Sequence, residues 1–333
     1  MTAKMRAMVI DQFGGAEVFR EGEVPLPVLR PGHVLIRVHA TSVNPVDCLI
    51  REMGPPFGPG LPAVLHGDVA GVIEQVASDV DAFQPGDEVY GCAGGMIGSG
   101  GALAEYMLAD AALIAHKPKR LSMRDAAALP LVTIAAWEGI QKAGIGAGHT
   151  VLVHGGAGGV GHVAVQLIRA AGAMVCATVS SERKAEIARD FGAQATVLYR
   201  MEDVPEYVRR LTDGAGFDVV FDTVGGSNLP KSFEAAKLNG AVVTTVALGQ
   251  FDLSPAHIKG LSLHVVFMCI PLIHGIGRAA HGMILQRAAH LADSGALRPL
   301  VDVHEFSIGE VAEAHRLMES GEATGKLILE AAW

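Results

Sequence analysis

The residues most suggestive of chemistry lie in the middle of this 333-residue chain, where segment 151–161 reads VLVHGGAGGVG. Gly156, Gly158 and Gly161 fit the pattern G-x-G-x-x-G between an apolar run and a helical pattern. In that context the glycines allow a tight turn, the approach of a pyrophosphate to bare backbone, and close packing of helix on strand. No Gly-Lys-Ser/Thr follows, which excludes a P-loop. We therefore predict a dinucleotide site formed by Gly156, Ala157, Gly158, Gly159, Val160 and Gly161.

The next apolar run, 174–179, ends in the sequence SSERK. An acidic side chain at this place would bind the ribose 2′-OH of NAD, whereas a cation would accept the 2′-phosphate of NADP. The tip is hydroxylic and then basic, and Glu182 lies slightly beyond the usual acidic position. We therefore predict NADP(H), with Ser180, Ser181, Arg183 and Lys184 around the phosphate. Ser181 can also cap the helix that follows, and the two roles are compatible.

Alternating strands and helices position these residues. The apolar runs are continuous and separated by helical patterns, which is typical of a parallel sheet covered on both faces. The middle of the chain is thus predicted to be a doubly wound α/β domain. Its expected strands are 150–154, 174–179, 195–198, 217–222, 241–248 and 264–270, and its expected helices are 125–143, 160–171, 182–191, 204–211 and 229–238.

The first third of the chain follows another pattern, in which apolar and polar residues alternate between turn residues. This period of two predicts a small β-rich domain. Segment 91–101 holds six glycines in eleven residues and predicts either a loop over a ligand or an ordinary surface loop. The expected elements are strands 6–10, 33–40, 69–76, 87–90 and 104–108, helices 279–294 and 308–320, and a last strand 325–330. The tail is assigned to the first domain.

Composition excludes several classes of protein. Hydrophobic residues make up 50% and charged residues 18% of the chain, which excludes a disordered chain. A net charge of −9 offers no field for a phosphate backbone, so no nucleic acid partner is expected. The cysteines are scattered, so neither a disulfide framework nor a Cys-rich zinc lobe is predicted. No signal peptide or membrane span is visible, and we expect a cytoplasmic protein without membrane contact.

With its β-rich start, HGGAGGVG turn, SSERK tip and C-terminal Thr324-Gly325-Lys326, the chain resembles the medium-chain dehydrogenase/reductase superfamily. Within it, the chain is similar to the zinc-independent quinone oxidoreductase branch over essentially its whole length. The resemblance implies a GroES-like catalytic domain interrupted by a Rossmann domain. We expect the first part of the catalytic domain at 1–124, the Rossmann domain at 125–271, and the return to the catalytic domain at 272–333.

The resemblance also bears on metal. Zinc-dependent members of the superfamily use a Cys in G-x-C-x-x-D, a His in G-H-E and a later Cys. The matching places hold Asn44, Gly67 and the cysteine-free segment 129–132. Zinc needs three or four donors at fixed geometry, so no metal site is predicted. His66 with Asp68 is the one neighbouring pair that could suggest a metal, and a turn histidine is the preferred interpretation.

Further site residues follow from the resemblance alone. Asn44, Asp47 and Arg51 are implied as catalytic residues near the nicotinamide. The alternative role for Asp47 is to cap the helix through Leu49 and Ile50. Ala135 stands where the family has a small hydroxyl residue, and Thr133 is a possible substitute. The remaining implied cofactor contacts are Asn44, Pro45, Tyr199, Leu248, Gly249, Phe267, Met268 and Lys326, the last expected to be exposed in a turn.

Together these observations predict an NADPH-dependent reductase of quinones or α,β-unsaturated carbonyls that works without zinc. Such acceptors spread the incoming charge over a conjugated oxygen, so a few hydrogen-bond donors can replace a Lewis acid. Two alternatives remain open: an alcohol dehydrogenase with an atypical metal site, and a nucleotide-binding protein with little turnover. The apolar strand 264–270 would lie at a sheet edge, which suggests a homodimer.

Overall fold

The computed structural model describes residues 3–333 and divides into two compact units. Unit 1 comprises Met1–Leu131, Cys269–Gly295 and Pro299–Trp333, and unit 2 comprises Val132–Met268 with Ala296–Arg298. The chain thus leaves unit 1 near residue 131 and returns to it near residue 269. The predicted fold class, a β-rich GroES-like domain with a doubly wound Rossmann domain, is confirmed.

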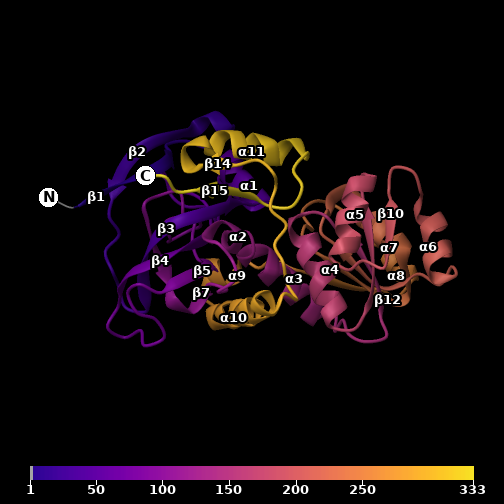
Figure 1. Cartoon of the computed structure of the whole chain (residues 1–333). Coiled ribbons are helices and arrows are strands. Elements are labelled where there is room, and N and C mark those ends of the chain that lie inside the picture. Colours follow the sequence, from indigo (N-terminus) through magenta and orange to yellow (C-terminus); the bar gives the residue numbers. More distant parts are fainter. Residues whose placement is uncertain (1–2) are drawn as a thin grey trace. The chain divides into compact units, whose positions relative to one another are not determined.

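Unit 2 is built on a six-stranded parallel sheet with the order β10-β9-β8-β11-β12-β13. Numbered from β8, this is the order 3-2-1-4-5-6 of dinucleotide-binding folds. Figure 1 shows α4 and α5 on one face of the sheet and α6, α7 and α8 on the other. The strands are β8 (Thr150–His154), β9 (Met174–Val179), β10 (Ala195–Leu198), β11 (Phe217–Asp222), β12 (Ala236–Thr244) and β13 (Ser262–Val265). The helices are α3 (Pro130–Lys142), α4 (Gly159–Ala170), α5 (Glu182–Asp190), α6 (Val204–Thr212), α7 (Leu229–Ala235) and α8 (Ser254–Ile258).

Burial explains why the central strands are apolar throughout. Val151, Leu152 and Val153 of β8 are fully buried because helices cover both faces of the sheet. One core cluster of unit 2 joins Leu152 to Phe217 and Phe233 from β11 and α7. The predicted strands 150–154, 174–179, 195–198 and 217–222 are confirmed at their predicted bounds.

Several elements differ from the prediction. α7 ends at Ala235 and β12 begins at Ala236, whereas a helix to 238 and a strand from 241 were expected. The predicted helix 125–143 is split into α2 (Met123–Ala127) and α3, which begins at Pro130 because proline favours a first helical turn. The predicted strand 264–270 is shorter. β13 ends at Val265, and a helix missed by the prediction, α9 (Ile270–His274), begins with Pro271 in its first turn.

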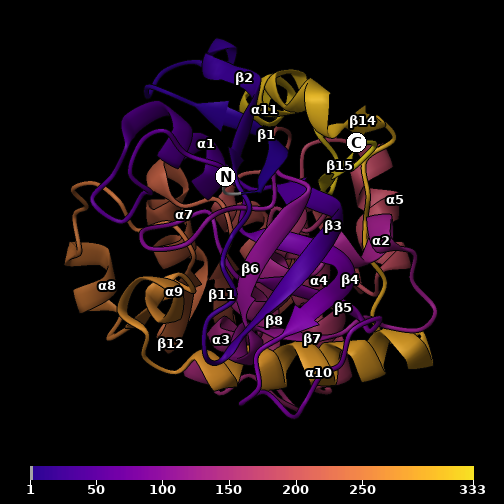
Figure 2. The same cartoon turned by 90° about the vertical axis from the view of Figure 1, so that its left-hand side faces the viewer.

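Unit 1 contains a seven-stranded, mainly antiparallel sheet and a two-stranded one. The larger sheet has the order β14-β15-β3-β4-β5-β7, with β6 paired to β3, and β1 pairs with β2. Figure 2 shows β3, β4 and β6 crossing its centre. The strands are β1 (Lys4–Ile10), β2 (Phe19–Pro25), β3 (His33–Val43), β4 (Asp68–Val76), β5 (Glu88–Cys92), β6 (Tyr106–Asp110), β7 (Ile114–His116), β14 (Phe306–Ser307) and β15 (Leu327–Glu330).

Helices border this sheet and carry several candidate residues. α1 (Pro45–Met53) follows β3, α10 (Arg278–Ser294) packs on β7, and α11 (Val311–Ser320) contacts α1 and β15. Short 3-10 turns occur at Ala16–Val18 (η1), Ala111–Leu113 (η2), Gly226–Asn228 (η3) and Ile308–Glu310 (η4). All four cysteines are buried and unbridged. Within residues 3–333, no helix is long and apolar enough to cross a membrane.

Candidate functional site

The glycine-rich turn of unit 2 leaves no room for side chains at two of its positions. A Cβ on Gly156 would lie 2.5 Å from that of Ala177 on β9, and one on Gly161 would lie 2.0 Å from the carbonyl oxygen of Gly155. At Gly158 the nearest neighbour is the same oxygen, 3.1 Å away. Gly156 and Gly161 are thus required by packing, whereas Gly158 leaves its backbone accessible.

Helix α4 begins directly after this turn, with Gly158 as its N-cap. The first N–H group that bonds back along the helix is that of His162, to the Gly158 carbonyl at 3.1 Å. The N–H groups before it belong to the first turn, which has no intrahelical acceptor. Together with the positive end of the helix dipole they suit a phosphate group.

His154 closes β8 immediately before the turn. Its Nδ1 lies 3.1 Å from the Thr178 hydroxyl oxygen, which also accepts a hydrogen bond from the Gly155 N–H at 3.3 Å. Burial lowers the pKa of His154 to about 4, so the imidazole is neutral at pH 7. This side chain supports the turn and is no source of protons at neutral pH.

The predicted cofactor residues of unit 2 all follow the carboxyl ends of parallel strands, and the edge where these strands end is the ligand-binding edge in doubly wound folds. The glycine turn follows β8, the serine tip follows β9, and Tyr199 follows β10. Leu248 and Gly249 come after β12, and Phe267 and Met268 after β13. Leu248 is 73% exposed and Phe267 39%, whereas Met268 is buried.

The tip after β9 is hydroxylic and basic, as the sequence suggested. Ser181 caps α5 by accepting a hydrogen bond from the Lys184 N–H at 3.3 Å. Ser180 is half-buried, and the exposed Arg183 has no partner among the described side chains. Glu182 lies 4.0 Å from Arg189, about two helical turns further along α5, with its side chain 70% exposed.

A third basic side chain at this tip, Arg200, was missed by the sequence analysis. The Tyr199 N–H donates to the Val179 carbonyl at 3.3 Å, so the ends of β9 and β10 lie side by side. Tyr199 is 47% exposed, and the Arg200 guanidinium lies 5.9 Å from the centre of its ring. Arg200 directly follows the predicted strand 195–198, but the sequence alone did not show that this strand pairs with 174–179.

Thr133 is the hydroxyl residue that the sequence offered in place of Ala135. Its Oγ1 is buried in α3 without a hydrogen-bond partner in the described part of the chain. An unpaired buried hydroxyl costs free energy, so a partner supplied by a ligand would relieve it. The unpaired hydroxyl of Thr133 therefore fits the hydrogen bond to a cofactor that the resemblance implies, whereas Ala135 has no polar side-chain group.

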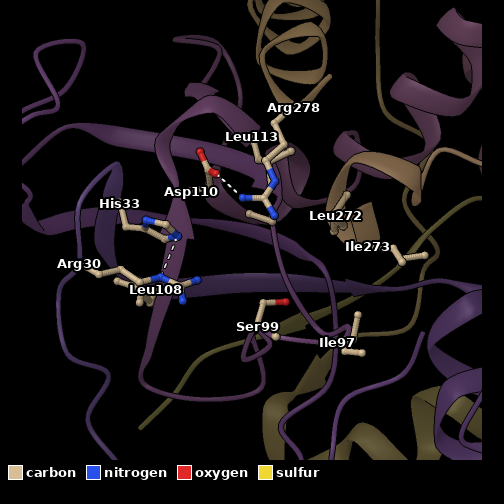
Figure 3. Close-up of a pocket in the computed structure, with 12 residues that line it drawn as sticks. Arg30, His33, Ile97, Ser99, Leu108, Asp110, Leu113, Leu272, Ile273 and Arg278 are labelled. Carbon is tan, nitrogen blue, oxygen red and sulfur yellow. Dashed lines mark hydrogen bonds and ion pairs between the residues drawn. The ribbon is translucent and has the colours of Figure 1, made fainter. Parts of the chain in front are cut away.

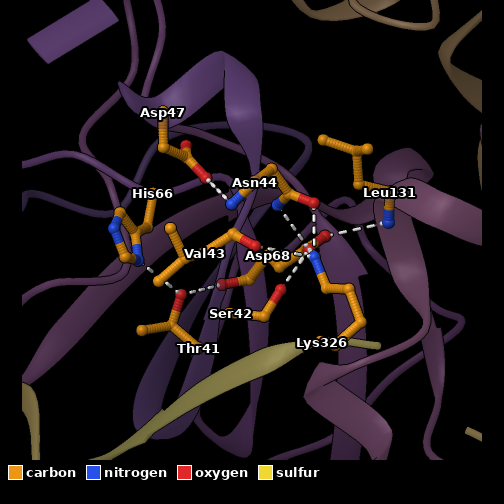
Figure 4. Close-up of polar contacts among 9 residues, drawn as sticks. All are labelled: Thr41, Ser42, Val43, Asn44, Asp47, His66, Asp68, Leu131 and Lys326. Carbon is orange, nitrogen blue, oxygen red and sulfur yellow. Dashed lines mark hydrogen bonds and ion pairs between the residues drawn. The ribbon is translucent and has the colours of Figure 1, made fainter. Parts of the chain in front are cut away.

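Unit 1 gathers a polar cluster around the carboxylate of Asp68 at the start of β4 (Figure 4). Its Oδ2 accepts hydrogen bonds from Ser42 Oγ at 2.6 Å and Asn44 Nδ2 at 2.8 Å, and its Oδ1 accepts the Leu131 N–H at 2.9 Å. Asp68 is fully buried. A buried carboxylate is tolerated here because donors and a nearby cation compensate it.

The cation is Lys326, and its position corrects an expectation. We expected an exposed lysine in the turn after Gly325, but Lys326 is 2% exposed. Its Nζ donates to the Val43 carbonyl at 3.0 Å and to Asn44 Oδ1, and lies 3.6 Å from Asp68 Oδ2. The side chain is pulled inward because β15, which it precedes, pairs with β3 next to Asn44.

Asp47 lies in the same region, but its carboxylate bonds to the backbone at the start of α1. Asn44 is the N-cap of α1, Pro45 occupies its first turn, and Asp47 Oδ2 accepts the Asn44 N–H at 2.8 Å. Asp47 therefore completes a capping box rather than being the cap itself. Burial, with the neighbouring charge of Asp68, raises the pKa of Asp47 to about 7.

Arg51 begins a chain of hydrogen bonds in which every donor is determined. Its Nη1 lies 3.3 Å from His315 Nδ1, and an arginine can only donate, so His315 carries its proton on Nε2. That proton faces His66 Nε2 at 2.8 Å, which leaves the His66 proton on Nδ1, 3.3 Å from Thr41 Oγ1. Thr41 in turn donates to the Asp68 carbonyl at 2.6 Å.

Both imidazoles in this chain are neutral. Burial and the charge of Arg51 lower the pKa of His315 to about 3, and burial, with the charge of Lys326, lowers the pKa of His66. Arg51 is itself anchored by the Gly14 carbonyl at 3.0 Å and by Glu319 at 2.5 Å. Its guanidinium is thus committed to partners inside unit 1.

The residues at the metal positions give zinc little to bind. Asn44 engages Asp68 and Lys326, and a Cβ on Gly67 would lie 3.1 Å from Cys92 Sγ. Both nitrogens of His66 are used by Thr41 and His315. Burial raises the pKa of the nearby Cys48 thiol to about 12. Across residues 3–333, no group of three or more His, Cys, Asp or Glu side chains is placed to hold a metal.

Comparison with known families matches both parts of the chain. Residues 30–119 match the alcohol dehydrogenase GroES-like domain, and residues 191–329 match the zinc-binding dehydrogenase family. The chain is 34% identical to 2-methylene-furan-3-one reductase of Solanum lycopersicum, with 98% of this chain and 79% of the relative covered. It is 30% identical to human quinone oxidoreductase, with 98% and 97% covered. It is also 32% identical to a chloroplastic NADPH-dependent alkenal/one oxidoreductase of Arabidopsis thaliana, with 98% and 79% covered.

Solved structures agree with these relatives. An alcohol dehydrogenase superfamily protein from Novosphingobium aromaticivorans superposes with a TM-score of 0.92 at 37% identity, covering 98% of this chain and 99% of the other. A mycobacterial protein solved in complex with NADPH superposes with a TM-score of 0.87 at 27% identity, covering 98% and 100%. The similarity therefore extends over both units.

Proposed function

Since the chain belongs to the medium-chain dehydrogenase/reductase superfamily, in its quinone oxidoreductase branch, we propose that it transfers hydride from NADPH to a quinone or an α,β-unsaturated carbonyl without zinc. When bound, the nicotinamide supplies the hydride. The electron-poor carbon of the acceptor receives it, and the oxygen or the α carbon takes a proton. The observation that carries the proposal is the accessible glycine turn at the strand edge of unit 2.

The chain's own residues suit NADPH better than NADH. The backbone at Gly158 and the N-terminus of α4 would hold the pyrophosphate. Arg183, Lys184 and Arg200 give the tip after β9 three positive charges, and Ser180 and Ser181 add hydroxyls. Glu182 follows Ser181 as the first residue of α5. A dianionic 2′-phosphate is therefore favoured over a ribose hydroxyl at this tip.

Asn44 is proposed as the group that polarises the acceptor. Its Nδ2 carries two hydrogens, and Asp68 is its single acceptor within the described residues. The second hydrogen can donate to a carbonyl or quinone oxygen, while Lys326 fixes the amide through Oδ1. Asp47 remains a proposed catalytic residue, and Arg51, which acts through His315, is a positioning residue.

The proposal is tested by following NADPH oxidation with a panel of quinones, enones and enoyl thioesters. We expect turnover with at least one class, with NADPH preferred over NADH, and undiminished by a chelator. An Arg183→Gln/Lys184→Gln variant should bind NADPH about tenfold or more weakly and NADH unchanged. Oxidation of an alcohol by protein holding stoichiometric zinc would instead support a metal-dependent dehydrogenase. Tight NADPH binding without turnover on any acceptor would support a nucleotide-binding protein.

We also propose a homodimer formed through β13. Within residues 3–333 this strand pairs with β12 alone and ends the sheet, and unpaired strand edges are usually covered. Leu263, Val265 and Phe267 on and after it are each more than a third exposed. Light scattering should give twice the mass of 34.7 kDa. A Val265→Lys variant should be monomeric, and a monomeric wild-type protein would rule the dimer out.

A further inference from the structure

A cavity lies within unit 1 and shares no residue with the polar cluster around Asp68. Its volume of about 460 Å³ falls in the range of ordinary small-molecule sites. It is lined from separate parts of the chain: Arg30 and His33 before and on β3, Ile97 and Ser99 in the glycine-rich loop, and Arg278 at the start of α10. Figure 3 shows these side chains around one hollow. We call it the Arg30–Arg278 cavity.

Each arginine is fixed by partners at its own rim. Arg30 donates from Nε to His33 Nε2 at 3.0 Å, and His33 Nδ1 lies 2.7 Å from the Pro31 carbonyl. Because a carbonyl only accepts, the His33 proton is on Nδ1, and this imidazole is neutral. The terminal Nη groups of Arg30 have no partner in the described part of the chain. They are therefore available to a ligand.

The net charge of the cavity is small and positive. Arg278 pairs with Asp110 at 2.7 Å and donates from Nε to the Pro271 carbonyl at 3.1 Å. With His33 neutral, two guanidinium groups and one carboxylate leave one positive charge. The chain as a whole carries −9, so this is a local reversal of sign. One positive charge balances a monoanion such as a carboxylate, whereas a phosphate dianion would be left partly uncompensated.

The opposite wall is aliphatic. Leu272 and Ile273 of α9 and Ile97 of the loop line one side of the hollow, and Leu108 of β6 lies next to Arg30 (Figure 3). Ile97 is 47% exposed although it is a large apolar side chain, and its N–H bonds to the Phe57 carbonyl at 2.9 Å. A ligand with an aliphatic body would cover this wall while its charged end reaches Arg30.

From this arrangement we propose that the Arg30–Arg278 cavity binds an aliphatic monocarboxylate, with the carboxylate on the Arg30 Nη groups and the chain against Ile97, Leu272 and Ile273. The glycine-rich loop 91–101, whose ligand the sequence left open, supplies one wall of this site. The proposal does not depend on the reductase function, since no residue of the cavity belongs to the groups proposed for catalysis.

Octanoate tests the proposal because it has both parts and no double bond to reduce. Isothermal titration of the full chain saturated with NADPH should show one octanoate site with a dissociation constant of about 1 mM or tighter. Octan-1-ol and inorganic phosphate should not compete with it. An Arg30→Gln variant should bind octanoate about tenfold more weakly, and Ile273→Asp should also weaken it. Arg209→Gln, an exposed arginine of unit 2, should leave binding unchanged.

Three results would overturn the proposal: no saturable octanoate binding, equal binding to wild-type and Arg30→Gln protein, or complete competition by octan-1-ol. Octanoate binding that is seen only in the absence of NADPH would place octanoate at the cofactor site and would also overturn the proposal. None of these results touches the reductase function, which is read from NADPH oxidation. Conversely, an inactive protein that binds octanoate as expected would remove the proposed function and leave this site standing.

Discussion

The polar cluster of unit 1 and the strand edge of unit 2 satisfy their polar groups in different ways. Around Asp68, carboxylate, amide, hydroxyl and ammonium groups bond to one another and are almost fully buried. At the edge of unit 2, the first N–H groups of α4 and the side chain of Arg183 are left to solvent or ligand. The first arrangement mainly stabilises the fold, with one Asn44 N–H left for the proposed acceptor, and the second keeps most of its binding groups available. Substitutions in the polar cluster should therefore change mainly the free energy of unfolding, and substitutions at the strand edge should change mainly ligand binding.

The largest effect is expected when the polar cluster around Asp68 loses the ammonium group of Lys326. Lys326→Met removes the ammonium and leaves the Asp68 carboxylate buried with neutral donors only. Breaking a buried ion pair by removing one partner typically costs about 3–5 kcal/mol. Urea unfolding followed by circular dichroism should show that loss. Lys119→Met, at an exposed lysine, should change the free energy of unfolding by less than about 0.5 kcal/mol.

A double variant makes this test sharper. Lys326→Met/Asp68→Asn removes both charges, so it should recover part of the stability lost in Lys326→Met. If Lys326→Met unfolds at the same urea concentration as Lys119→Met, the ion pair between Lys326 and Asp68 contributes nothing to the free energy of unfolding. That result would contradict the stabilising role given to the polar cluster.

The next largest effect is expected at the strand edge of unit 2 and should appear as weaker binding of NADPH. Gly158→Ala places a methyl group where a pyrophosphate would approach the backbone, yet its φ of −90° suits an alanine. We expect NADPH to bind about 100-fold more weakly, equal to about 2.7 kcal/mol, measured by titration calorimetry. Replacing glycine by alanine at an N-cap should cost about 1 kcal/mol of stability.

Gly146→Ala provides the matched control, because a Cβ there meets no atom within 4 Å. This variant should bind NADPH like the wild type. Equal NADPH affinity in Gly158→Ala and the wild type would contradict the binding site proposed at the glycine turn.

A third effect is the pH dependence of stability, which arises from the buried histidines of unit 1. His315 is neutral when folded, with its pKa lowered to about 3, whereas an unfolded histidine titrates near 6.5. As pH falls below about 6.5 the unfolded chain takes up a proton that the folded chain refuses, so stability is lost. His66 adds to this loss, and the raised pKa of Asp47 opposes it between about pH 4 and 7.

Comparing variants separates these contributions. Between pH 7 and pH 5, His315→Gln should lose about 2 kcal/mol less stability than the wild type, because its unfolded chain lacks the imidazole that takes up a proton. Urea unfolding at the two pH values gives the difference. The same loss in both proteins would mean that His315 is protonated in the folded state, against the donor order deduced from Arg51.

How far the sequence predicted these two regions depended on the distance between the residues involved. The glycine turn and SSERK tip were found because a strand, a turn and a helix follow one another within about thirty residues, and local patterns report such units. Arg200 was missed although it lies beside this tip. It belongs to the neighbouring strand, and strand neighbours cannot be derived from one segment alone.

The closed cluster could be predicted only in part. Asn44 and Asp47 came from a resemblance, and their chemical partners did not. The Lys326 ammonium meets the Asn44 amide from 282 residues away, through the pairing of β15 with β3. A turn sequence Gly-Lys gives no hint of such burial. Likewise, Ala236–Leu238 suits helix and strand alike, and pairing with β11 decides for a strand.

The smallest effect tests whether one residue serves both stability and binding at the open edge. Ser181 caps α5 and also stands where a 2′-phosphate is proposed. Ser181→Ala should cost about 1 kcal/mol of stability, and Ser181→Asp should restore the cap. Only the binding readout separates the roles: a carboxylate repels a phosphate, so Ser181→Asp should weaken NADPH more than Ser181→Ala while leaving NADH unchanged. If NADPH and NADH weaken equally in Ser181→Asp, then Ser181 is a helix cap alone, and the preference for NADPH rests on the basic side chains around it.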